Sequence, residues 1–177
     1  MLGISGVGKS HLTRAIAKAL PSAIRLTASS LLRKELHTTG EKLRTAEGGD
    51  VRNNQALLVS ALKAERRGRW DRPVLLEAHT FIDNDRELVD VPTDVMRDLD
   101  VAGILVLEAP ASEISRRRLN DKRKRPRRSV SEIEHQQAHS SAIARKYAAE
   151  LDIPLKFVKS GDKLAATEFI EQVLEAN

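Results

Sequence analysis

The N-terminal residues Gly3-Ile4-Ser5-Gly6-Val7-Gly8-Lys9-Ser10 constrain this chain more than any other feature. They have the spacing G-x-x-x-x-G-K-S, in which glycines let the backbone curl so that successive N–H groups surround one anion. A lysine at this position reaches the β- and γ-phosphates of a nucleotide, and a serine hydroxyl is a hard ligand that suits Mg2+. We therefore predict a site for ATP and Mg2+ formed by Gly3, Gly6, Val7, Gly8, Lys9, Ser10 and His11.

The residues after Ser10 predict a helix that begins at this loop. Apolar side chains recur there with helical spacing, at Leu12, Ala15, Ile16, Ala19 and Leu20. Such a helix points its positive dipole end at the bound phosphate. A phosphate loop ordinarily follows a buried strand, yet only Met1 and Leu2 precede it here. We expect a first strand reduced to a stub, or a chain start placed too far downstream.

Length and composition favour one soluble globular domain. The chain has 177 residues, of which 41% are hydrophobic and 31% charged. It lacks a long apolar run and a secretion-signal pattern, so we expect neither export nor membrane spanning. It has no cysteine, which excludes disulfides and thiolate chemistry and is compatible with the cytoplasm. Aromatic residues, at 3%, are too few for a base-stacking nucleic-acid platform.

Short apolar runs alternate with helical stretches along the rest of the chain. Runs typical of strands lie at 23–27, 73–78, 103–109 and 154–158. Predicted helices lie after the serines at 29 and 30, over 50–68, near Ser112, from the Ser129-to-Glu132 capping box to about 150, and over 164–174. Residues 37–50 predict a flexible connection. This alternation indicates βαβ units and a parallel sheet with helices on both faces.

Acidic residues close two of the predicted strands. Glu77 ends the run 73–78, where an acid beside the phosphate loop can hold Mg2+ through water. A solvent-facing carboxylate is the alternative. His79 lies at the mouth of the same site, where it contacts a substrate phosphate or base, or only hydrogen-bonds its own loop. For Glu108, which ends the next strand, we favour a structural role.

A cationic run occupies residues 116–128, with nine Lys and Arg and one Asp. It contributes +8 to a net charge of +5, so the rest of the chain carries −3. Its place in the chain predicts a lid that brings Arg116, Arg123 and Arg125 onto the phosphates. Two alternatives are non-specific nucleic-acid binding and a solvated connection. A lid does not need Arg127 and Arg128 as further cations, so we expect these two residues at the surface.

The loop GISGVGKS, the strand-end Glu77-Ala78-His79 and the basic run before a long helix together resemble archaeal-type adenylate kinases and related nucleoside monophosphate kinases. The resemblance implies a three-layer α/β P-loop NTPase fold, with a five-stranded parallel sheet in the order 2-3-1-4-5, helices on both faces and a short Arg-rich lid. It implies one domain over 1–177, in which 28–68 bind the acceptor and 116–128 form the lid. Homo-oligomers also occur in this family.

The resemblance further assigns acceptor residues. Ser29, Ser30 and Arg33 resemble the segment that receives the monophosphate, and Gln55 is placed to touch the acceptor base. A solvent-facing role for Arg33 is the alternative. The chain departs from the family pattern at Ser5, which replaces a loop proline, and at Glu77, which replaces an aspartate. The stretch after His79 is also acidic, and Asp83 and Asp85 would repel a monophosphate that they faced.

We therefore predict an ATP-dependent phosphotransferase that converts ATP and a nucleoside monophosphate into ADP and a nucleoside diphosphate. The transfer is in line, and Mg2+, Lys9 and the lid arginines stabilise it. One alternative is a P-loop kinase of another small metabolite or of an RNA end. The other is a P-loop ATPase or switch that binds nucleic acid through the basic run.

Overall fold

The computed structural model describes residues 1–45, 48–121 and 126–176. Helices and strands alternate along most of this length. From the N-terminus they are α1 (Lys9–Ala19), β1 (Ile24–Thr27), α2 (Ala28–Glu35), α3 (Gly40–Arg44), α4 (Gly48–Arg66), β2 (Val74–Glu77), β3 (Phe81–Asp83), β4 (Leu88–Asp90), α5 (Thr93–Asp98), β5 (Ile104–Glu108), α6 (Ala111–Leu119), α7 (Val130–Leu151), β6 (Leu155–Lys159) and α8 (Lys163–Glu175).

The strands at the centre of the molecule are parallel and pair two by two. β1 pairs with β2, and β5 pairs with β6. The first two residues of the chain lie between these pairs. The Met1 backbone forms hydrogen bonds of 2.8 and 3.0 Å on the β2 side, and the Leu2 backbone forms bonds of 2.7 and 3.0 Å to β5. The described strands therefore form two parallel pairs, and Met1 and Leu2 lie between them with Leu2 in an isolated parallel bridge to Val106. The five-strand order stays a prediction.

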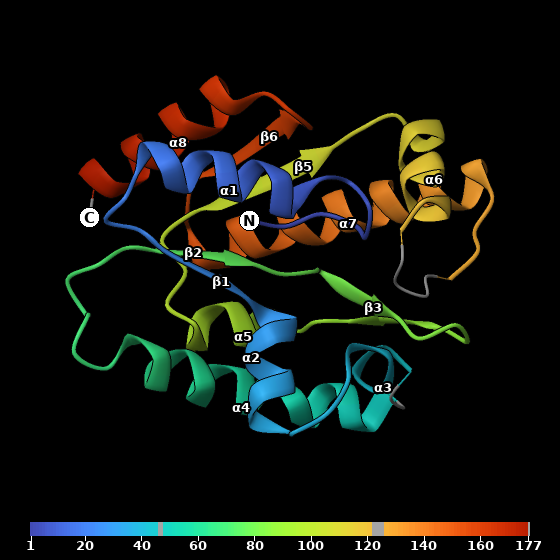
Figure 1. The fold of residues 1–177 in the computed structure, drawn as a ribbon, viewed down its shortest axis with the longest axis horizontal. Helices are drawn as coiled ribbons and strands as arrows, with labels where there is room; N and C mark the ends of the chain where they lie inside the picture. The colour runs from blue at the N-terminus through green and yellow to red at the C-terminus, as the bar shows by residue number, and fades with distance from the viewer. Residues whose placement is uncertain (46–47, 122–125, 177) are drawn as a thin grey trace.

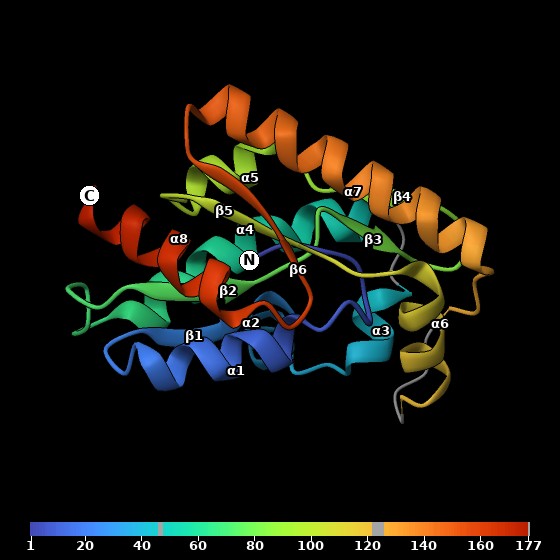
Figure 2. The same ribbon diagram turned by 90° about the horizontal axis from the view of Figure 1, so that it is seen from above.

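Helices cover both faces of these strands, as the alternation predicted. Helices α1 and α7 lie on opposite sides of them (Figure 2). α1 contacts β1, β2 and α8, while α7 contacts β5, β6 and α5. α1 buries Leu12 and Ile16, and α7 buries Ile133, Ile143 and Tyr147, so each helix contributes one apolar stripe to the core. α2, α3 and α4 gather beyond β1 (Figure 1).

The capping box predicted at the start of α7 is confirmed. The Ser129 side chain accepts from the Glu132 backbone, and the Glu132 carboxylate accepts from the Ser129 N–H at 2.7 Å. These bonds satisfy N–H groups that a helix end would otherwise leave without partners. The helix that carries the far side of the site therefore begins at a residue defined by local sequence.

Four described elements were not predicted. The connection over 37–50 contains α3, which begins because the Thr39 side chain accepts from the Lys42 N–H at 3.2 Å. The acidic stretch after His79 forms the antiparallel hairpin β3–β4, turned by Asn84, whose side chain accepts from two backbone N–H groups, and by Asp85 at φ 77°. α5 follows it. Among the described residues, no helix is both long and apolar enough to cross a membrane.

Candidate active site

The loop before α1 depends on its glycines. Gly3, Gly6 and Gly8 have φ of 137°, 85° and 110°, values that side-chain-bearing residues rarely adopt. A Cβ on Gly3 would lie 2.9 Å from the Leu107 carbonyl oxygen, and one on Gly8 would lie 2.5 Å from Ser160 Oγ. Gly8 is also the N-cap of α1, and no side chain caps that end. Because no side chain caps it, this positive end of the helix dipole is suited to an anion.

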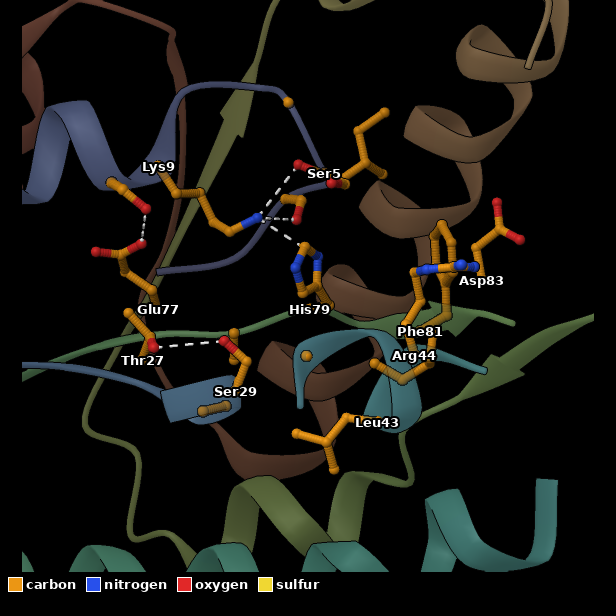
Figure 3. Close-up of a pocket in the computed structure, with 18 of the residues that line it drawn as sticks. Ser5, Lys9, Thr27, Ser29, Leu43, Arg44, Glu77, His79, Phe81 and Asp83 are labelled. Carbon is orange, nitrogen blue, oxygen red and sulfur yellow. Dashed lines mark hydrogen bonds between the residues drawn. The ribbon is translucent and has the colours of Figure 1, made fainter. Parts of the chain in front are cut away.

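Lys9 crosses the inside of this loop. It is only 8% exposed, and its Nζ lies 2.6 Å from the Gly3 carbonyl oxygen and 3.2 Å from that of Ile4. His79 approaches from the other side, with Nδ1 3.4 Å from Lys9 Nζ (Figure 3). The structure thus brings together two predicted residues that are 70 positions apart. An ammonium donor held in this way faces the place where the loop binds phosphate oxygens.

Glu77 is 5% exposed at the end of β2, and two hydroxyls of α1 lie against it. Ser10 Oγ donates to Glu77 Oε2 at 2.5 Å, and Thr13 Oγ1 lies 2.5 Å from Glu77 Oε1 and 2.7 Å from the Lys9 carbonyl oxygen. A Ser10 hydroxyl that donates its hydrogen to a carboxylate keeps its lone pairs for a cation. This arrangement fits a Mg2+ held directly by Ser10 and through water by Glu77.

The loop forms one wall of a cavity of about 870 Å3. The end of β1, α2 and α3 form the opposite wall, where Thr27, Ser29 and Arg44 are seen in Figure 3. Ser30 and Arg33 also line it. Arg33 is exposed and folded back on its own helix, with Nε donating to the Ser29 carbonyl oxygen at 3.2 Å. All three acceptor residues predicted on α2 therefore line the cavity.

Arg44 was missed because its segment was expected to be flexible. Its Nη1 lies 2.6 Å from Asp85 Oδ2, and its Nε is buried with no hydrogen-bond partner among the described residues. An unbonded guanidinium N–H beside a cavity is suited to an anionic oxygen. The sequence signal that could have identified it is the Thr39 cap, which places Arg44 one turn into a helix.

The lid arginines differ from the prediction. Arg116 is exposed and lies outside the cavity lining, whereas Arg117 and Arg118 line it. Arg117 Nη1 donates to the Val7 carbonyl oxygen at 2.8 Å, and Arg118 Nε donates to that of Ser5 at 2.8 Å. Helical phase explains the correction, because α6 buries Ala111, Ile114 and Arg118 on one stripe. Arg123 and Arg125 lie outside the described residues.

The remaining predicted residues have mixed positions. His11 lines the cavity, whereas the Val7 side chain is fully buried in the core and only its carbonyl oxygen faces Arg117. The side chain of Gln55 lies outside the described part of the structure. Glu108 accepts from Ser141 Oγ at 2.9 Å, which agrees with a structural role.

Asp83 carries an ionised carboxylate on the hairpin side of the cavity. Burial alone would raise the pKa of Asp83, but hydrogen bonds from Arg128, Gln136 and the Asp85 N–H hold it below its usual value. Arg128 forms two bonds to it, of 2.8 and 3.1 Å, and its own pKa is raised chiefly by that contact. Arg128 therefore holds the C-terminal end of the predicted lid against β3, while Arg127 is exposed.

No group of three or more His, Asp and Glu side chains that could hold a metal occurs in the part of the chain described here. The donor set at Ser10 nevertheless fits a cation that is shared with bound phosphates, because such sites draw most of their ligands from phosphate and water. The uncapped helix end, Lys9 and Arg117 beside the loop fit the triphosphate itself.

Comparison with known proteins agrees with this geometry. Residues 2–136 match the family described as AAA domain. The adenylate kinases of Pyrococcus abyssi and Thermococcus onnurineus are each 27% identical to this chain, covering 98% of it and 91% of their own length. The crystal structure of shikimate kinase from Bacteroides thetaiotaomicron superposes with a TM-score of 0.57 at 16% identity, covering 98% of this chain and 96% of that one.

The chain therefore belongs to the AAA domain family of P-loop proteins. More closely, it is an adenylate kinase-like P-loop kinase, an ATP-dependent phosphotransferase with an α/β fold. These relatives imply a small-molecule phosphoryl acceptor. The alternative of a P-loop ATPase or switch without kinase activity does not agree with this class.

Proposed function

We propose that this enzyme transfers the terminal phosphoryl group of ATP to a nucleoside monophosphate. The observation that carries the proposal is the cavity in which the phosphate-binding loop faces a second wall of hydroxyls and arginines. Its volume, about 870 Å3, is within the range of ligand pockets, and the opposed walls suit two anionic substrates placed end to end. The relatives named adenylate kinase support a nucleotide acceptor.

The ATP side is formed by the loop, Lys9 and the first turn of α1. The backbone from Gly3 to His11 would surround the phosphates, and Lys9 would contact the group that is transferred. Mg2+ held by Ser10 and Glu77 would neutralise charge on the β- and γ-phosphates. No covalent intermediate is needed, because positioning and charge stabilisation account for in-line transfer.

The acceptor side is formed by α2 and α3. Arg33 and Arg44 would bind the monophosphate, with the Ser29 and Ser30 hydroxyls as further donors. Among the described residues, the hydrogen bonds of the Arg33 guanidinium go to groups of its own helix, so it can turn toward an anion without breaking a hydrogen bond between elements. We further propose that Gln55 contacts the acceptor base and that His79 contacts the transferred phosphoryl group.

The acidic hairpin does not oppose this proposal. Asp83 is bonded by Arg128 and Gln136, and Asp85 is paired with Arg44. Both carboxylates are thus partnered by groups of the protein, which reduces their repulsion of an incoming phosphate. The pairing of Arg44 also favours a second candidate, a neutral hydroxyl-bearing metabolite, because it leaves less free cationic charge on that wall.

Several finer features are part of the proposal. We infer that Met1 and Leu2 occupy the central strand position, which would complete the order 2-3-1-4-5. We also infer that residues 28–68 act as the acceptor-binding segment and 116–128 as the lid, in which Arg123 and Arg125 complete the set of cations begun by Arg117 and Arg118. Oligomerisation stays a prediction of the family resemblance.

A coupled assay of ADP release tests the proposal. AMP, CMP, GMP, UMP and the deoxynucleoside monophosphates are supplied singly with Mg-ATP, next to a panel of hydroxyl-bearing metabolites without phosphate. We expect release above the ATP-only rate with at least one monophosphate. Release with a metabolite and with none of the nucleotides would favour the second candidate and contradict the first.

A further inference from the structure

A buried chain of polar side chains connects the phosphate-binding loop with the β3–β4 hairpin. Arg118, on α6, donates from Nε to the Ser5 carbonyl oxygen at 2.8 Å. Its Nη1 and Nη2 each lie 3.3 Å from Gln136 Oε1 on α7. Gln136 Nε2 then donates to Asp83 Oδ2 at 2.8 Å. Four separate segments of the polypeptide, namely the loop, α6, α7 and β3, thus meet through consecutive hydrogen bonds beside the cavity.

The two central residues of this chain are almost excluded from solvent. Gln136 is 5% exposed and Arg118 is 9% exposed. Polar groups buried to this extent depend on their protein partners, since water cannot replace a lost bond at low cost. A change at one end of the chain is therefore expected to alter the next contact along it.

The chemistry of the neighbours determines the orientation of the Gln136 amide. A guanidinium only donates hydrogen bonds and an ionised carboxylate only accepts them. The carbonyl oxygen of Gln136 must therefore face Arg118, and its NH2 group must face Asp83. An amide satisfies both neighbours at once, whereas neither a carboxylate nor an apolar group at this position can.

We propose that Gln136 is a positioning residue that couples Asp83, on the hairpin, to the phosphate-binding loop through Arg118. Asp83 thereby contributes to nucleotide affinity although it lies on the hairpin and not on the loop. The proposal depends on nucleotide binding at the loop, which follows from the enzyme class, and not on which acceptor the enzyme uses.

A polarity swap tests this coupling. Asp83→Asn removes the acceptor-only neighbour, and Gln136→Glu places a second carboxylate beside Asp83. In the double variant, the introduced asparagine amide can donate to the new carboxylate, whose other oxygen still accepts from Arg118. ADP affinity is measured by calorimetry without any acceptor. We expect each single variant to bind ADP about 5- to 10-fold more weakly, and the double variant to recover to within about 3-fold of the wild type.

If the two substitutions act independently, the ADP affinity of the double variant falls by the product of the two single losses. This result would overturn the proposal. Gln136→Met keeps the length of the side chain without its amide and should also bind ADP about 5- to 10-fold more weakly. If it binds as the wild type does, the proposal is also overturned.

Gln137→Met is the matched control, because Gln137 lies on the same helix and bonds the Ala109 backbone. The ADP affinity of this variant should stay within about twofold of the wild type. Thermal unfolding of each variant separates lost affinity from lost structure.

Discussion

Ser10 Oγ donates to Glu77 Oε2 at 2.5 Å, which joins the first turn of α1 to the end of β2. A glutamate reaches further than an aspartate and has one more rotatable bond. Thr13, fully buried at 2.5 Å from the other carboxylate oxygen, restricts that bond from the same helix. Two hydroxyls spaced one turn apart therefore hold the acid in the orientation that a Mg2+ site at Ser10 requires.

Thr13→Val keeps the shape of the side chain and removes one of these hydroxyls. The buried carboxylate then lacks a donor, so we expect the free energy of unfolding to fall by about 1–3 kcal/mol. Because Glu77 becomes less well oriented, the Mg2+ concentration for half-maximal activity should rise. Mg2+ titration of ADP release measures this. Thr13→Ser keeps the hydroxyl and should restore the wild-type requirement, and an unchanged requirement in Thr13→Val would contradict the assigned role.

Lys9→Ala should lower the rate of phosphoryl transfer about 100- to 1000-fold, the range measured when one preorganised donor is removed from a transition state. The reason is the position of Nζ inside the loop, against the Gly3 and Ile4 carbonyl oxygens. The assay is ADP release with the best acceptor. Lys18→Ala removes a cation from the last, exposed turn of the same helix and should leave the rate within about twofold. Turnover retained in Lys9→Ala would mean that another group faces the phosphates.

Features that depend on local spacing were predicted from the sequence. The glycine positions, the stripe of α1 and the capping box at Ser129 each involve residues within about two turns of one another, so a linear pattern contains the whole interaction. The same holds for the apolar runs that became β1, β2, β5 and β6. The two strand pairs, in contrast, are connected through Met1 and Leu2, and two residues are too few to produce any periodic signal.

Other features depend on contacts between distant segments. The hairpin β3–β4 has no clear alternation of apolar and polar residues, and it is held by the bond from Tyr147 to the Val91 carbonyl oxygen and by Thr80 with Ser140. Arg118 was missed because chain order, and not helical phase, was used to select the lid arginines. The sequence predicted that Asp83 would repel a monophosphate that it faced, since nothing local indicates a partner 45 residues away.

The stability of the protein should depend on pH through Asp83. Its folded-state pKa is below its ordinary value, so ionised Asp83 stabilises the fold above about pH 4 and this contribution disappears as the pH falls through the folded-state pKa. Urea unfolding of the wild type and of Asp83→Asn between about pH 3 and 7 measures the difference. We expect the wild-type advantage to be constant from about pH 5 to 7 and to shrink below about pH 4. An advantage that grew on acidification would contradict the assigned pairing with Arg128.

Gly8→Ala should weaken nucleotide binding about 10-fold or more while the fold is retained. At φ 110° an alanine is strained by about 1–3 kcal/mol, and its Cβ would lie 2.5 Å from Ser160 Oγ, so the loop or the β6–α8 connection must move. ADP calorimetry measures the loss. Gly49→Ala is the matched control, since its Cβ meets open space in a helix, where alanine is favoured by about 0.5–1 kcal/mol. It should bind ADP as the wild type does. Equal affinities for both variants would show that the loop tolerates displacement at Gly8, and that the phosphates are held mainly by side chains.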